Sequence, residues 1–189
     1  MPLYKNKYRI ESARLRGWDY ASEGAYFITI CTKDRQHFFG ECAEGKMVLS
    51  TIGAIVQGFW FEIPKHFPSI QLGEFVVMPN HIHGILVIDY LESHVETLQS
   101  REETLQCNVS TEPTFFQQIS PKPKSISAIV RSYKAICTKH IKQAFPSVEF
   151  GWQERFWDTI IRDNQSFETI SNYIVNNPLS WHEDKFGNG

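Results

Sequence analysis

Two histidines one residue apart, His81 and His83, open an apolar, β-branched run that ends at Ile88. This composition predicts a largely buried strand. Side chains two positions apart on a strand point to the same face, so both imidazoles can approach one metal ion from one side of a sheet. A lone histidine would more simply pack or cap the strand end. A matched pair just after the turn Met78-Pro79-Asn80 favours a metal site.

Length and composition describe an ordinary globular chain. Its 189 residues are enough for one domain with a core, and 42% hydrophobic and 14% aromatic content excludes a disordered protein. No apolar run approaches the ~20 residues that span a bilayer, and the N-terminus does not resemble a signal peptide. The four cysteines form no Cys-x-x-Cys pair. We therefore expect reduced thiols, a cytoplasmic protein and no membrane partner.

The net charge of −2 hides an uneven distribution of charge. The stretch 113–148 contains no Asp or Glu, and the first 16 residues are basic, with Glu11 as their one acidic residue. The segment after Asp89 is acidic. A localised basic surface suits a polyanion such as DNA, although a solvated helix face accounts for it nearly as well.

Hydrophobic periodicity predicts strands at 25–31, 46–49, 71–78 and 81–88, and helices from 51 to 63, from 125 to before 146, and from 166 to 176. This order indicates an α+β, ferredoxin-like antiparallel sheet with helices packed on one face, plus a C-terminal helical extension. The expected organisation is a basic arm (1–23), a domain (24–150) with a flexible insertion at about 91–120, and the extension (151–189).

Tyr133 is the candidate nucleophile on local grounds. A helix lying across the sheet could bring its phenol to the metal, where a cation would help a group with a pKa near 10 to react. Tyr133 also falls on the apolar stripe of its helix, so a core aromatic is an open alternative. Tyr173 precedes a helix-ending Asn-Asn-Pro and is expected to serve packing.

Four segments in this order resemble a known family. His81-Ile82-His83 matches the His-hydrophobic-His signature of the HUH endonucleases. Together with the segments 130–135, 152–155 and 173–181, the run 78–83 is similar to single-tyrosine transposases, above all the REP-associated tyrosine transposases. The resemblance extends from about residue 24 to residue 181.

The resemblance implies a transposase-like, metal-dependent endonuclease and strand transferase for single-stranded or hairpin DNA. His81 and His83 would bind Mg²⁺ or Mn²⁺, and Tyr133 would form a transient 5′-phosphotyrosine. The DNA backbone would contact Arg14, Arg16, Arg131, Lys134 and Lys139. Trp152, Phe156 and Trp157 could stack unpaired bases, although core packing is expected for at least two of them. Such a protein would associate with the nucleoid, and relatives act as dimers or as monomers.

One departure from the family pattern leaves alternatives open. Insertion-sequence relatives carry a third metal ligand, a Gln or similar residue, one helical turn after the tyrosine, where this chain has Cys137. Asn80, Thr138 and His140 are the other candidates. A domesticated hairpin-DNA-binding protein without strand transfer therefore remains an alternative, and an unrelated His-x-His metal hydrolase is a weaker one.

Overall fold

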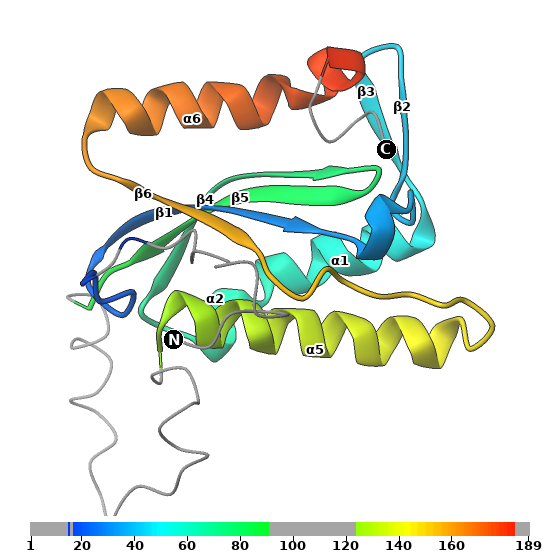
Figure 1. The fold of residues 1–189 in the computed structure, drawn as a ribbon, viewed down its shortest axis with the longest axis horizontal. Coiled ribbons are helices and arrows are strands. Elements are labelled where there is room, and N and C mark those ends of the chain that lie inside the picture. Colours follow the sequence, from blue (N-terminus) through cyan, green and yellow to red (C-terminus); the bar gives the residue numbers. More distant parts are fainter. Residues whose placement is uncertain (1–14, 16, 91–123, 184–189) are drawn as a thin grey trace, which may run out of the picture.

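Four antiparallel strands form the central sheet, in the spatial order β4-β5-β1-β6 (Figure 1). The computed structural model describes residue 15 and residues 17–90 and 124–183. The strands are β1 (Gly24–Cys31), β2 (Gly40–Ala43), β3 (Lys46–Leu49), β4 (Ile70–Met78), β5 (His81–Ile88) and β6 (Trp157–Ile161). The helices are α1 (Thr51–Phe61), α2 (Ile63–His66), α5 (Ile126–Ala144) and α6 (Asn164–Asn176), with short 3₁₀ segments η1 (Lys33–Arg35) and η2 (Asn177–Glu183).

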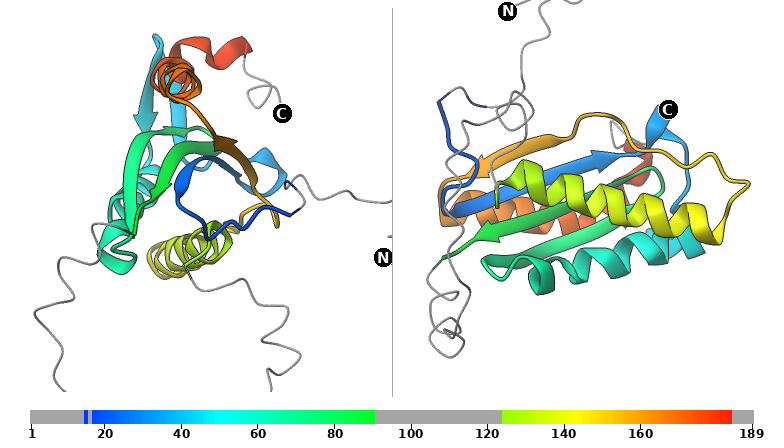
Figure 2. Two further views of the ribbon diagram at one scale, coloured as in Figure 1. Left: turned by 90° about the vertical axis from the view of Figure 1, so that its left-hand side faces the viewer. Right: turned by 90° about the horizontal axis from the view of Figure 1, so that it is seen from below.

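The order β1-α1-β4-β5-α5-β6 and the strand arrangement are those of a ferredoxin-like fold, which confirms the predicted class. Helices α1 and α5 pack together on one face of the sheet, as Figure 2 shows from below. Helix α6 covers the other face (Figure 1). The hairpin β2–β3 is inserted between β1 and α1. Strand β6 was not predicted, and it joins the segment after residue 150 to the main sheet through β1.

Side-chain N-caps mark the first residues of α1, α5 and α6. Ser50 accepts a hydrogen bond from the Gly53 amide at 3.0 Å, and Ser125 accepts one from the Ala128 amide at 3.4 Å, so α1 and α5 begin where predicted. Asp163 caps α6 by accepting from the Ser166 amide at 2.7 Å. Each cap satisfies a backbone donor that the first helical turn leaves unpaired.

Alternation along β5 divides its side chains between two apolar clusters. Ile82, Leu86 and Ile88 belong to the main core with α1 and α5. Ile85 and Val87 belong to the smaller cluster beneath α6. His81 and His83 share the parity of Ile85, so they lie on the α6 side of the sheet.

The predicted insertion at about 91–120 lies outside the described residues, as does the basic arm apart from residue 15 and residues 17–23. Within the part of the chain that the structure describes, no helix is both long and apolar enough to cross a bilayer.

Candidate active site

His81 and His83 bring their Nε2 atoms to 3.0 Å from each other, and both side chains are buried. The prediction that the two imidazoles share one face is confirmed. Two nitrogens that are each about 2.1 Å from one ion, at about 90° to each other, would lie about 3 Å apart. The pair therefore has the spacing of two ligands to a single metal ion.

The opposite ring nitrogens are held by neighbouring polar groups. His81 Nδ1 lies 2.8 Å from Asn80 Oδ1, and His83 Nδ1 lies 2.8 Å from Thr29 Oγ1 on β1. An amide oxygen only accepts, so His81 carries its proton on Nδ1 and its lone pair on Nε2. The Thr29 hydroxyl can donate or accept, so it supports either tautomer of His83. Such outer contacts orient metal-binding histidines.

The electrostatic surroundings keep His81 neutral. Burial, with a further contribution from the positive charge of Arg35, lowers the pKa of His81 from 6.5 to about 3. Arg35 ends η1, where both Asp34 and Arg35 adopt left-handed backbone angles, with φ of 52° and 53°. Thr32 ties this 3₁₀ turn to the turn just before the histidine strand, through hydrogen bonds of its amide and hydroxyl to the Asn80 carbonyl, at 2.9 and 3.0 Å.

Tyr173 reaches the histidines from α6. Its hydroxyl lies 3.3 Å from His83 Nε2, and its ring packs edge-on against Phe27 with centroids 6.1 Å apart. Tyr173 as a whole is 41% exposed, so solvent reaches part of this residue. Tyr173, which was expected to serve packing, therefore also makes a polar contact with the histidine pair.

Tyr133 does not reach the histidines, and the prediction that it does is wrong. It lies on α5, across the sheet from them, 3% exposed in the main core. Its hydroxyl donates to the Val56 carbonyl at 2.9 Å, and its ring meets Trp60 edge-on. Burial, with the neighbouring Cys137, raises the pKa of Tyr133 well above 10.0, which disfavours the phenolate. The apolar stripe of its helix had indicated this core role.

The α5 candidates for a third metal ligand lie, like Tyr133, on the face of the sheet opposite the histidines. Burial raises the pKa of Cys137 to about 12, so its thiol stays protonated. His140 packs against Phe59 of α1, and the Thr138 hydroxyl donates to the Lys134 carbonyl. Asn80 instead contacts the far nitrogen of His81 through its Oδ1. Among the described residues, no group of three His, Cys, Asp or Glu side chains could hold a metal ion.

Asn177 and Trp181 continue the run that begins at Tyr173, one and two helical turns further on. Tyr173 contacts His83, and Trp181 stacks on His81 with ring centroids 6.0 Å apart and planes at 30°. Asn177 lies between them in sequence, keeps helical backbone angles, and is 1% exposed. An amide one turn after the tyrosine matches the expected ligand pattern. The sequence analysis predicted neither residue as part of the site. The four-residue spacing of Tyr173 and Asn177 is the sequence signal that could have identified both.

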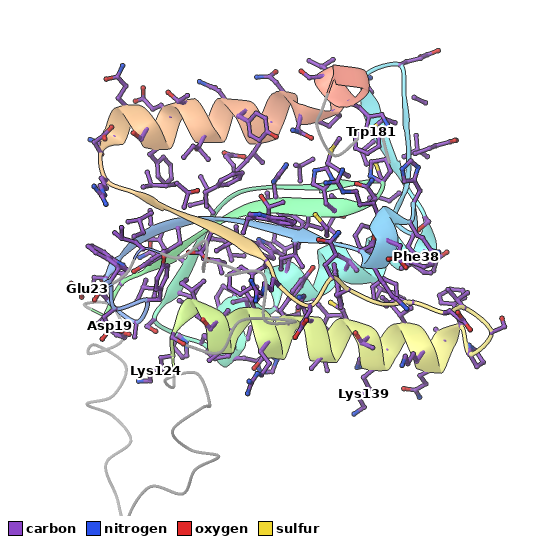
Figure 3. The ribbon with its side chains drawn as sticks, in the orientation of Figure 1. Asp19, Glu23, Phe38, Lys124, Lys139 and Trp181 are labelled. Carbon is purple, nitrogen blue, oxygen red and sulfur yellow. The ribbon has the colours of Figure 1, made fainter. Side chains whose placement is uncertain are left out.

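Three of the expected DNA-binding residues, Arg131, Lys134 and Lys139, belong to the described part of the chain and lie on α5, apart from the histidines. Arg14 and Arg16 are outside the described residues. Arg131 and Lys139 are exposed on α5, and Figure 3 shows Lys139 and Trp181 on opposite sides of the sheet. Lys134 donates to the Gln153 and Glu154 carbonyls at 2.7 and 3.3 Å, so it anchors the segment before β6. Burial lowers the pKa of Lys134.

Comparisons with known proteins agree with this architecture. An uncharacterized protein of Haemophilus influenzae is 36% identical over 176 residues, covering 92% of this chain and 91% of that protein. A second protein of that organism, named "Putative REP-associated tyrosine transposase", is 23% identical over 162 residues, covering 85% of this chain and 73% of the other. The solved structure of a REP-associated tyrosine transposase bound to a REP hairpin aligns with a TM-score of 0.51 and 16% identity, over 88% of this chain and 74% of that one. No family model matches the chain.

Fold and sequence therefore confirm the resemblance to the REP-associated tyrosine transposases. In this chain, a His-hydrophobic-His pair faces a helical tyrosine. The chain belongs to the same family as the uncharacterized Haemophilus influenzae protein.

Proposed function

We propose that the protein is a metal-dependent, transposase-like endonuclease and strand transferase that uses Tyr173 as its nucleophile. The observation that carries this proposal is the placement of the Tyr173 hydroxyl 3.3 Å from His83 Nε2, beside a pair of histidine nitrogens 3.0 Å apart. The substrate is single-stranded or hairpin DNA, in line with the hairpin bound by the structural neighbour.

In the proposed step, the Tyr173 oxygen forms a bond to phosphorus while the bond from phosphorus to the 3′ oxygen breaks. The products are a 5′-phosphate esterified to Tyr173 and a free 3′-hydroxyl. The phenol releases its proton to the solvent that reaches it, and the departing 3′ oxygen takes one up. Attack by a 3′-hydroxyl on the phosphotyrosine ester reverses the step and rejoins a strand.

The donor set fits a hard divalent cation such as Mg²⁺ or Mn²⁺. His81 and His83 would supply nitrogen, and Asn177 would supply an amide oxygen as the third ligand. The ion, when bound, would polarise the phosphate oxygens. Two nitrogen ligands favour Mn²⁺ at least as well as Mg²⁺. Arg35, whose charge acts on His81, is suited to attract the phosphate.

The domesticated-binder alternative loses its main support. It depended on Cys137 standing in the place of an oxygen ligand, and Asn177 stands one turn after the tyrosine that faces the histidines. Since Tyr173 and His83 of one chain meet each other, we propose that a single chain assembles the site.

The test is the covalent adduct. Tailed hairpins from the genome that encodes the protein, incubated with Mn²⁺, should give a protein–DNA band that survives denaturing electrophoresis. Tyr173→Phe should abolish the band and keep hairpin binding, whereas the same band in Tyr173→Phe would remove Tyr173 from the mechanism. No adduct from the wild type with any such hairpin would favour the binding-module alternative.

A mixing experiment tests the single-chain site. Tyr173→Phe and His83→Ala each lack one half of the site, so a mixture of the two should form no adduct if the halves meet within one chain. Restoration of the adduct in the mixture would show that tyrosines are exchanged between subunits, and would overturn the single-chain assignment.

A further inference from the structure

Trp157, the first residue of β6, exposes an aromatic ring beside the histidine face. Its side chain is 43% exposed, whereas Trp60 and Trp181 are buried. A large apolar ring left open to water at a proposed substrate site is a candidate ligand contact.

The sheet register places Trp157 near the histidines. Ile161 packs in the cluster beneath α6 and Ile160 in the main core, so alternation puts Trp157 on the α6 side with Ile161. Trp157 lies opposite Thr29 on β1, and Thr29 lies opposite His83 on β5. Two strand spacings of about 4.8 Å separate the Cα atoms of Trp157 and His83 by roughly 10 Å.

The other two aromatics of this segment have structural roles. Trp152 packs against Phe39 and Phe150, with ring centroids 5.5 and 5.2 Å apart. Phe156 packs against the main core. Of the three aromatics that could stack bases, Trp157 is the one that is exposed to solvent. The other two pack against the core, in agreement with the expectation that at least two of the three serve core packing.

Trp157 and Tyr173 are both exposed aromatics of the described residues on this face, at 43% and 41% exposure. Strand β6 is the outer strand of the described sheet on that side, so a DNA strand can approach over it. With its scissile phosphate at the histidines, such a strand would carry a neighbouring base across Thr29 toward Trp157. Stacking on an aromatic ring tolerates any base, because every base has a π-face.

We propose that Trp157 is a stacking subsite for an unpaired nucleobase next to the scissile phosphate. This inference rests on the proposed function, since it assumes DNA at the histidine site. The subsite would position the strand without regard to its sequence, and would leave sequence selection to other contacts.

The test compares two fluorescent probes, a 20-nucleotide oligo(dT) and an abasic 20-mer with the same phosphate backbone. Binding is measured by anisotropy in EDTA on the Tyr173→Phe background, so that neither metal nor cleavage contributes. Trp157→Ala should weaken oligo(dT) binding by about 5-fold to 150-fold, equivalent to about 1–3 kcal/mol, and leave abasic binding unchanged. Trp157→Phe should keep most of the affinity, and Trp157→Leu, which retains apolar bulk, should lose it.

Phe61→Ala is the matched control, because Phe61 is 56% exposed at the end of α1 and its ring contacts Phe75, which packs against the main core on the other face of the sheet. It should change neither affinity. Equal losses for both probes, full binding by Trp157→Leu, or no binding of oligo(dT) by the parent would each overturn the subsite. If Trp157→Ala weakens only oligo(dT) binding but the wild type forms no covalent adduct, the proposed function is overturned and the stacking subsite stands. If the wild type forms the adduct but Trp157→Ala leaves oligo(dT) binding unchanged, the subsite is overturned and the proposed function stands.

Discussion

Replacing Tyr133 with Phe removes one buried oxygen from the core and should leave the chemistry intact. The Tyr133 hydroxyl donates to the Val56 carbonyl at 2.9 Å, and the ring keeps its contacts with Trp60 and Trp152 in the variant. Because no cavity forms, the cost is that of one buried hydrogen bond, about 0.5–1.5 kcal/mol. For a chain of this size, about 1 kcal/mol lowers the melting temperature by about 2–4 °C.

Tyr173→Phe should behave in the opposite way. Its side chain is 41% exposed, so the free energy of unfolding should change by less than about 0.5 kcal/mol. The assay pairs thermal melts followed by circular dichroism with the covalent adduct assay on the same preparations. Tyr133→Phe should melt earlier and form the adduct, and Tyr173→Phe should melt normally and form none. A folded Tyr133→Phe variant without the adduct would refute the assignment of Tyr133 to the core.

The remaining predictions concern the metal ligands, the sheet and a helix cap. Thr29→Val should weaken Mn²⁺ binding, measured by electron paramagnetic resonance, by about 10-fold to 100-fold, because the substitution removes the contact to His83 Nδ1. His83→Ala should abolish high-affinity Mn²⁺ binding, and unchanged binding in this variant would exclude the site. Gly84→Ala should destabilise the protein by about 1–3 kcal/mol in denaturant melts, because the new Cβ would overlap the Trp60 ring and lie 3.0 Å from Phe75 Cδ2. Gly58→Ala should stabilise the protein by about 0.4–1 kcal/mol, because Gly58 has open space around it in α1. Equal effects of the two substitutions would contradict the packing around Gly84. Hydrogen bonds from Ser166 lower the pKa of Asp163, so the α6 cap contributes stability above pH 3.8, the ordinary pKa, and loses it as the pH falls through the lowered pKa of the folded protein. Asp163→Ala should therefore lower the melting temperature at pH 7 and flatten the dependence of the melting temperature on pH below 3.8. An unaltered pH dependence in this variant would count against the cap.

Local patterns in the sequence were enough for much of the fold and for half of the site. Period-two alternation determined that His81 and His83 share a face, and the caps at Ser50 and Ser125 determined where two helices begin. Strand β6 escaped prediction because it is short and half exposed, so its pattern is weak.

Only the tertiary structure decided which tyrosine meets the histidines. Tyr133 and Tyr173 each lie on an amphipathic helix, and periodicity does not reveal which face of a sheet a helix covers. Crossovers between parallel strands are almost always right-handed, so the connections β1-α1-β4 and β5-α5-β6 place α1 and α5, with Tyr133, on one face. Helix α6 follows the completed sheet and covers the face toward which the alternation of β5 directs the histidines, and that is why Tyr173 reaches them.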